Sequence, residues 1–466
     1  MSAIPATEPS AREWLRRLSQ REISAVELTQ YVLARIDAVD SRLNAVVARD
    51  DAAAMAAARA ADEARQRGES LALLGLPVTV KDSLEAVGLP CSCGSFAREG
   101  YRPERDATVV ARLRAAGAII VAKTNVPEYT WSYETENALH GRTVNPFSSE
   151  RTPGGSSGGE AALLGADASI VGLGTDGGGS IRVPCHYCGI AGLRPTAGLV
   201  AETGCWPSTR DTGYFDMATI GPMARHVEDL GLVLRVIAGP DGIDPLVQGA
   251  ELRDEGGVDV RGLRIGFYDY DGLWRVSSGV AAGVEAAAAA MEELGCDVER
   301  ATPPDLTRAT ELFFGLMAAD GGARARADLA PASGRHVEQM SRLLEDLRPL
   351  ALDAAEFFTL LAELFAFRAS VRAFVGRYDV VIAPAAAGPA PLHGCVPGSD
   401  LPLENYDAFN YTHVYSAAGL PVAVVRIGEE RNLPVGVQLV SRAFRDDLAL
   451  AAAAALEERF GRFQPS

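Results

Sequence analysis

Two short apolar runs with a helical segment between them constrain the fold of this chain more than any other feature. The runs cover residues 76–80 and 119–122, and Gly117 ends the helical segment 107–116. An alternation of strand, helix and strand is typical of α/β proteins, in which helices pack on the sheet that the strands form. The pattern therefore predicts an α/β fold.

Each apolar run is followed by a lysine, and lysine is rare in this chain. Of the 44 Lys and Arg residues only Lys81 and Lys123 are lysines, which leaves 42 arginines. A lysine that is desolvated at the end of a strand can lose its proton near neutral pH, whereas an arginine cannot. Lys81 and Lys123 are both candidates for a general base, and composition does not choose between them.

Helical and strand patterns continue along the rest of the chain. Ser24 and Glu27 form the sequence of a capping box, which predicts a helix over 24–39. The segment 239–262 is predicted to be a surface segment within one domain, and 384–402 is predicted to be a long loop. Further helices are predicted at 50–67, 224–237, 280–294, 305–327, 353–376 and 446–460, and further strands at 263–268, 378–383, 421–425 and 434–439.

Composition and charge exclude several classes of function. A net charge of −17 without a basic stripe disfavours binding to nucleic acid. The start of the chain lacks the features of a secretory signal, and no stretch approaches the length of a membrane span, so we expect a cytoplasmic protein. The seven cysteines are thinly spread, and Cys185-x-x-Cys188 has no second ligand pair, so we expect reduced thiols and no metal.

Glycine is concentrated in one part of the chain, because 13 of the 47 glycines lie between Gly154 and Gly198. A phosphate-binding loop is disfavoured because Glu160 follows this glycine run where a P-loop has lysine. Gly154-x-Ser156-x-Gly158 matches a nucleophile elbow, but Arg151-Thr152-Pro153 precedes it where an elbow needs a strand. None of the six histidines has a recognisable catalytic context, which points to a base other than histidine.

Several motifs together resemble the amidase signature family. Segments 125–160 and 174–194 are most similar to its fatty acid amide hydrolase branch. The resemblance implies one domain over 1–466, with N-terminal helices in 1–70, a core at about 75–225 and a C-terminal half, 260–466, that completes the sheet and the pocket. It also implies a mixed, mostly parallel sheet covered by helices on both faces. The motifs are 75–82, 116–125, 154–159, 174–182, 192–196, 221–225 and 433–439.

The resemblance assigns a Ser-Ser-Lys triad. It implies that Lys81 is the base, that Ser156, preceded by a cis peptide, is the bridging serine, and that Ser180 is the nucleophile that forms an acyl-enzyme. No cofactor is implied. The backbone N–H groups expected to hold the oxyanion belong to Gly177, Gly178, Gly179 and Ser180. The residues expected to support the site without reacting are Lys123, Ser157, Asp176 and Arg182.

The substrate is less constrained than the triad. Aromatic residues around Thr130 are candidates for the pocket, although aromatics are as often core residues. We expect hydrolysis of a small, largely apolar amide, anilide or carbamate, with a small molecule as the only partner besides a second copy in a homodimer. The alternatives are a tRNA-dependent amidotransferase A-type subunit that needs partner subunits, and a binding scaffold without activity. The candidate pocket residues are Tyr129, Thr130, Trp131, Tyr133 and Trp206.

Overall fold

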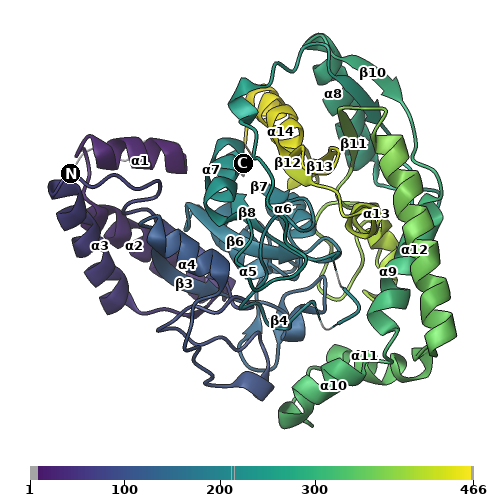
Figure 1. Cartoon of the computed structure of the whole chain (residues 1–466), viewed down its shortest axis with the longest axis horizontal. Helices are drawn as coiled ribbons and strands as arrows, with labels where there is room; N and C mark the ends of the chain where they lie inside the picture. Colours follow the sequence, from purple (N-terminus) through teal and green to yellow (C-terminus); the bar gives the residue numbers. More distant parts are fainter. Residues whose placement is uncertain (1–8, 211, 215, 463–466) are drawn as a thin grey trace.

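A mixed sheet of eleven strands runs through the centre of the protein (Figure 1). The computed structural model describes residues 9–210, 212–214 and 216–462. The strand order is β1-β3-β2-β6-β8-β7-β12-β13-β11-β9-β10, and β4 and β5 form a separate hairpin. The strands are β1 Val46–Ala48, β2 Pro77–Lys81, β3 Ile119–Thr124, β4 Glu136–Asn137, β5 Gly141–Arg142, β6 Val171–Asp176, β7 Ala191–Arg194, β8 Thr219–Ala224, β9 Arg264–Phe267, β10 Asp297–Arg300, β11 Val380–Pro384, β12 Val422–Glu430 and β13 Leu433–Val440.

Helices connect most of these strands. The capping box of Ser24 and Glu27 is present and starts α2, as the sequence predicts. The helices are α1 Ala11–Ser19, α2 Ala25–Leu43, α3 Asp51–Gln66, α4 Thr108–Ala115, α5 Gly158–Gly165, α6 Arg182–Cys188, α7 Val227–Ile237, α8 Ser278–Glu293, α9 Ala309–Ala318, α10 Ala323–Leu329, α11 Glu338–Asp346, α12 Ala354–Val375, α13 Asn410–Ala418 and α14 Asp446–Phe460.

Helices cover both faces of the sheet, which confirms the predicted α/β class. Along β12, Ala423 and Val425 pack into a core that includes residues of α7, α8 and α14. Val422 and Val424 pack into cores on the other face, with residues of α13 and α6. Successive side chains of a strand point to opposite faces, so this strand is apolar on both sides.

The sheet is less parallel than expected. Within the described chain, its ten strand pairings comprise four parallel pairs and six antiparallel pairs. The parallel pairs lie towards the two ends of the strand order, whereas the middle contains antiparallel strands such as the hairpin of β12 and β13. A short turn connects antiparallel neighbours, while a parallel pair needs a longer crossover. The expectation of a mostly parallel sheet is therefore wrong.

One predicted helix is divided. The sequence pattern predicts a single helix over 305–327, but α9 ends at Ala318 and α10 begins at Ala323. Gly321 and Gly322 lie between them with φ angles of +64° and +74°. Positive φ is incompatible with a continuing right-handed helix, and glycine adopts it at little cost. The glycine pair therefore ends one helix and turns the chain into the next.

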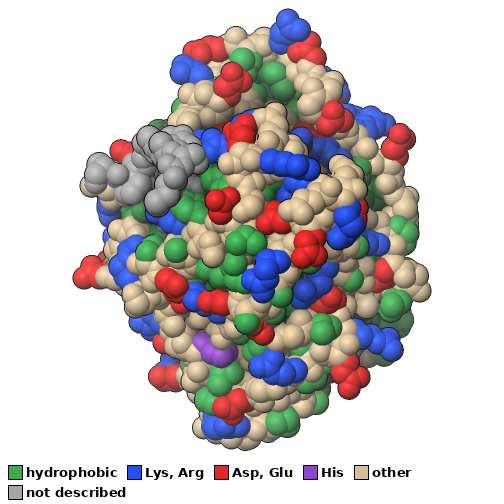
Figure 2. All heavy atoms as spheres, turned by 90° about the vertical axis from the view of Figure 1, so that its left-hand side faces the viewer, with side chains coloured by type: hydrophobic (Ala, Val, Ile, Leu, Met, Phe, Trp, Pro, Cys, Tyr) green, Lys and Arg blue, Asp and Glu red, His purple; other side chains and the backbone are tan. Residues whose placement is uncertain are grey.

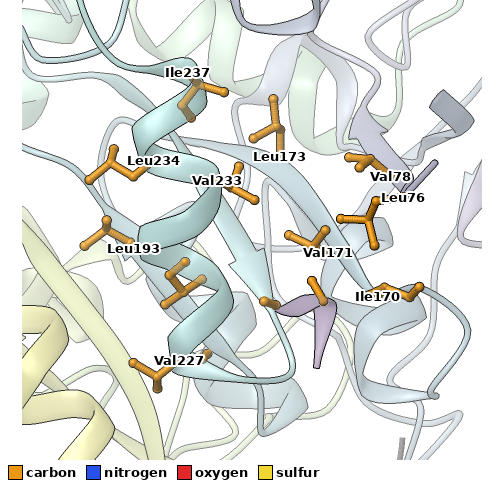
Figure 3. Packing of buried hydrophobic residues seen from close by; sticks show 14 of the residues in the cluster. Leu76, Val78, Ile170, Val171, Leu173, Leu193, Val227, Val233, Leu234 and Ile237 are labelled. Atoms are coloured by element: carbon orange, nitrogen blue, oxygen red, sulfur yellow. The ribbon is translucent and has the colours of Figure 1, made fainter. Parts of the chain in front are cut away.

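The strands that position the candidate site are held by a continuous apolar core. Figure 3 shows part of it, where the apolar side chains of β2 and β6 lie opposite α7. Val78 and Leu173 are fully buried there, as are Val233 and Ile237 of α7. At about 25 cal/mol per Å² of buried apolar surface, such a core fixes the strand ends and the residues on them.

The outer surface carries mixed charge on the face that Figure 2 shows. Arginine and acidic side chains alternate there, and no large patch of one sign is visible. Among the described residues, no helix is long and apolar enough to cross a membrane.

Candidate active site

Lys81 is the last residue of β2 and is fully buried. Its Nζ lies 2.7 Å from Ser156 Oγ and 2.7 Å from Thr175 Oγ1. Thr175 lies near the end of β6, the parallel neighbour of β2, so two adjacent strand ends bring these groups together. Within the described chain no carboxylate forms an ion pair with Lys81.

Burial changes the acidity of this amine. Desolvation lowers the pKa of Lys81 to about 7, although nearby thiols and Asp176 act in the opposite direction. The charged form is the one that loses water on burial, so the neutral amine is favoured. Near neutral pH a large share of Lys81 can therefore accept a proton.

Ser156 lies in the turn that precedes α5. The peptide between Gly155 and Ser156 is cis, as the family resemblance implies. Ser156 is buried, and the backbone N–H of Ser157 donates to the carbonyl of Ser180 at 3.1 Å. This hydrogen bond joins the loop before α5 to the loop before α6.

Ser180 lies in the loop between β6 and α6 and is partly exposed. Ser156 and Ser180 line the same cavity, but within the described chain no hydrogen bond joins their hydroxyls. Such contacts are often longer before substrate binds. The structure thus brings Lys81 and Ser156 into direct contact and places Ser180 beside them.

The glycines before Ser180 have close neighbours. A Cβ on Gly178 would lie 2.6 Å from Phe313 Cζ, and one on Gly177 would lie 2.9 Å from the ring of Tyr214. The Gly179 N–H donates to Asp176 Oδ1 at 2.8 Å. Since that N–H is already engaged, the expected oxyanion donors are reduced to Gly177, Gly178 and Ser180.

Asp176 and Arg182 clamp this loop, as predicted. Arg182 Nη2 lies 2.8 Å from Asp176 Oδ1, and both side chains are fully buried. Burial would raise the pKa of Asp176, but the charge and hydrogen bonds of Arg182 outweigh it and hold that pKa well below its usual range. The carboxylate therefore stays charged and serves as an acceptor for the loop.

Lys123 has different partners. Its Nζ lies 3.1 Å from Asp82 Oδ1 and donates to the carbonyl of Leu84 at 2.7 Å. Burial would lower the pKa of Lys123, but the charge of Asp82 outweighs it and raises that pKa. Lys123 is thus an ion-pair residue that holds the chain after β2.

Two cavities of about 40 Å³ each have Ser180 in their walls. Thr130 lines both, and Trp131 and Tyr133 line one of them. Tyr129 and Trp206 line neither, because their rings pack edge to face at 5.1 Å. The hydroxyl of Tyr129 donates to Asp328 at 2.8 Å, and Tyr129 is fully buried whereas Trp206 is partly exposed. These two rings therefore pack against each other outside the two cavities that Ser180 lines.

Several residues that contact the triad or line the two cavities are not among the predicted site residues, and three of them show why. Thr175 contacts Lys81, Glu202 lines the cavity that contains both serines, and Phe313 lines the other cavity. Thr175 directly precedes Asp176 in a recognised motif, so its position could have been found from the sequence. Glu202 and Phe313 come from segments that only the fold brings to Ser180.

Comparisons with known proteins agree on the family. The amidase family model matches residues 27–450. A curated relative, the A subunit of glutamyl-tRNA(Gln) amidotransferase from Roseiflexus castenholzii (strain DSM 13941 / HLO8), is 37% identical over 95% of this chain and 94% of its own.

Solved structures are similar to this chain over nearly its whole length. One, described as an unexpected vestigial protein complex that reveals the evolutionary origins of an s-triazine catabolic enzyme, is 30% identical with a TM-score of 0.89, over 98% of this chain and 100% of its own. The A subunit of glutamyl-tRNA(Gln) amidotransferase from Thermotoga maritima is 27% identical with a TM-score of 0.79, over 98% of this chain and 97% of its own.

These relatives correct two expectations. Three curated relatives that are 34–37% identical carry the name of an amidotransferase component, not that of an enzyme for apolar amides, anilides or carbamates. The expected main activity is therefore wrong, and the amidotransferase alternative is the one that they support. The expectation of a small molecule without protein subunits or nucleic acid is wrong as well, because their name specifies both a tRNA and a subunit. The motifs identify the family and do not specify the substrate.

Proposed function

The chain belongs to the amidase family, and from this premise we propose that it is the A-type subunit of a tRNA-dependent amidotransferase and releases ammonia from the side-chain amide of glutamine. Full-length similarity to subunits of that name supports the proposal. Partner subunits would then carry the glutamyl-tRNA(Gln) that receives the ammonia. This role would place the chain in the cytoplasm.

The observation that carries the chemistry is the buried contact between Lys81 and Ser156. Neutral Lys81 takes the proton of Ser156 while Ser156 takes the proton of Ser180, and Ser180 Oγ bonds to the amide carbon. A base whose pKa lies near the working pH is the most effective for this transfer. The burial that lowers the pKa of Lys81 to about 7 meets this requirement.

Charge then develops on the amide oxygen. The N–H groups of Gly177, Gly178 and Ser180 would hold it, and the Asp176–Arg182 pair keeps their loop in place. Losing one such donor typically costs about 10²–10³ in rate. Ser156 returns its proton to the departing nitrogen, the carbon–nitrogen bond breaks and ammonia leaves. Water then attacks the acyl carbon by the reverse proton path and frees Ser180.

The space directly beside Ser180 favours a small reacting group, while Phe314, Met317, Leu343 and Tyr406 of one cavity also line a neighbouring cavity of about 1050 Å³. Each cavity beside Ser180 has about 40 Å³, whereas sites for drug-sized ligands have about 300–1,000 Å³. The side-chain amide of glutamine and the ammonia that leaves it need little room. Aromatic leaving groups such as anilines would require Tyr214 or Phe313 to move.

The proposal is tested by measuring ammonia release from glutamine. The purified chain is assayed alone and with the other subunits of the amidotransferase, and Ser180→Ala serves as the inactive control. We expect release from glutamine that increases when the partner subunits and charged tRNA are present. Cleavage of simple aryl amides by the chain alone, without release from glutamine under either condition, would contradict the proposal.

A further inference from the structure

The cavity that contains both serines is lined mainly by oxygen-bearing side chains. It has about 40 Å³, more than the roughly 10–15 Å³ that a cavity needs to hold one water molecule, so it has room for a small polar molecule. Its oxygen-bearing lining residues are Thr130, Ser156, Thr175, Ser180, Glu202, Thr209, Tyr214 and Thr219.

Two of these residues have a buried oxygen without a hydrogen-bond partner in the described chain. They are Glu202, through Oε1, and Thr219, through Oγ1. Glu202 is 6% exposed and Thr219 is 1% exposed. A buried polar atom without a partner is costly, so native proteins seldom leave one unless a ligand or water satisfies it.

The remaining contacts of Glu202 do not satisfy this oxygen. Thr209 donates its hydroxyl to the other carboxylate oxygen, Oε2. The guanidinium of Arg210 lies 3.7 Å from Oε1, beyond hydrogen-bond distance, while its Nη2 pairs with Asp244 at 2.8 Å. Burial raises the pKa of Glu202, although Arg210 opposes this. The cavity thus presents a poorly hydrated carboxylate, which accepts hydrogen bonds and attracts positive charge.

We infer that this cavity is an amine subsite, in which Glu202 and Thr219 accept hydrogen bonds from the ammonia released at Ser180; this inference rests on the proposed function. Ammonia and ammonium are small and rich in N–H donors, and the carboxylate favours them over water. The subsite keeps the nitrogen next to the acyl-enzyme. Ser180 and Glu202 line the same space, so no rearrangement of the loop is needed.

The same subsite would bind a small nitrogen nucleophile in the reverse direction. Hydroxylamine can replace ammonia there and attack the acyl-enzyme. Its nitrogen bonds to the acyl carbon, the bond from that carbon to Ser180 Oγ breaks, and the proton lost by nitrogen passes through Ser156 to Ser180. The product is a hydroxamate, and attack by water gives the acid. The ratio of the two products reports how well the subsite holds nitrogen.

The experiment measures this ratio with an acyl-enzyme formed from p-nitrophenyl acetate, so it needs neither glutamine nor partner subunits. We expect Glu202→Gln to lower the hydroxamate-to-acid ratio by about tenfold, in line with the loss of a hydrogen bond to a charged group. Thr219→Val, a second variant if Glu202→Gln does not fold, should lower it by a smaller factor. Asp244 does not line the cavity, and in Asp244→Asn the side-chain oxygen can still accept from the Glu202 backbone N–H and from Arg210, so this variant should leave the ratio unchanged.

Each outcome decides the inference. A ratio that is unaffected by both Glu202→Gln and Thr219→Val would show a site for water only, and an equal decrease in Asp244→Asn would show an effect of loop structure. Either result overturns the inference. If the ratio responds as expected while glutamine is not hydrolysed in the complete complex, the proposed function fails and the amine subsite stands.

Discussion

Lys81 and Lys123 lie on neighbouring parallel strands, and both are fully buried, yet their chemistry differs. In the register of β2 and β3, Lys81 pairs with Thr124 and Lys123 pairs with Val80. The offset of one residue directs the two side chains to opposite faces of the sheet. On one face Lys81 meets the hydroxyls of Ser156 and Thr175, and on the other Lys123 meets the carboxylate of Asp82.

The difference shows that burial alone does not make a lysine a base. Desolvation acts on both amines, but of the two only Lys123 has a carboxylate in the described chain close enough to restore the charged form. The pKa values therefore move in opposite directions, one to about 7 and the other above its usual range. A buried lysine with neutral hydroxyl partners is the arrangement suited to proton transfer.

We expect the largest difference between the two lysines when each is replaced with arginine, the basic residue that this chain otherwise uses. Arginine keeps the charge but cannot lose its proton. Lys81→Arg should lower the turnover of amide substrate by about 10²–10⁴, the usual contribution of a general base. Lys123→Arg should keep most activity, because an ion pair with Asp82 is still available. Steady-state kinetics of both variants measure the loss of turnover. Comparable losses in the two variants would contradict the assignment of Lys81 alone as the base.

The next largest effect is on stability. Lys123→Met leaves Asp82 as a buried charge without its cation, which typically costs about 3–5 kcal/mol. Lys81→Met leaves only neutral hydroxyls behind, so its free energy of unfolding should fall less or increase. Denaturant unfolding of the two variants shows which of them has the lower free energy of unfolding. A larger loss for Lys81→Met would mean that Lys81 is held charged in the native protein.

A smaller effect is the dependence of activity on pH. Lys81 must be neutral to accept a proton, so kcat/KM should rise with pH, with a midpoint of about 7, and level off above it. Below the midpoint it should fall about tenfold per pH unit. A flat profile from pH 6 to 9 would exclude a titrating base in this range.

The smallest expected effect identifies which group titrates. Glu160 is buried against Thr79 and Thr124, and burial raises its pKa to about 7 as well. Its hydrogen-bond partners in the described chain are these two threonines and neither serine, so Glu160→Gln should leave the midpoint of the profile unchanged. If the midpoint disappears in this variant, the profile reports Glu160 and not Lys81.

Signals in the sequence predicted much of the fold, and they selected residues that the structure brings together, such as Lys81 and Ser156. The capping box of Ser24, the strands that end near Lys81 and Lys123, and the three triad positions depend on neighbouring residues or on motifs. The division of the 305–327 segment was also readable, since Gly321 and Gly322 interrupt it. A pair of glycines is stronger evidence that a helix ends than apolar residues at helical spacing are that it continues.

Other features depend on which distant segments meet. Trp206 and Tyr129 pack against each other and leave the pocket to Phe313 and Glu202, and no local pattern indicates this. The antiparallel direction of the strands in the middle of the sheet likewise depends on how the chain connects one strand to its neighbour. The substrate depends on loops and partners, whereas the motifs belong to the shared chemistry, which is why the expected apolar substrate was wrong.

The most direct test of the central claim follows from the presence of two lysines only. Protein labelled with ¹³C at lysine Cε gives two side-chain signals, and Lys123→Arg assigns them by removing one. We expect the Lys81 signal to titrate with a midpoint of about 7, while the Lys123 signal stays that of a charged amine up to about pH 10. Two signals that both titrate above pH 10, or a midpoint near 7 assigned to Lys123, would contradict this expectation.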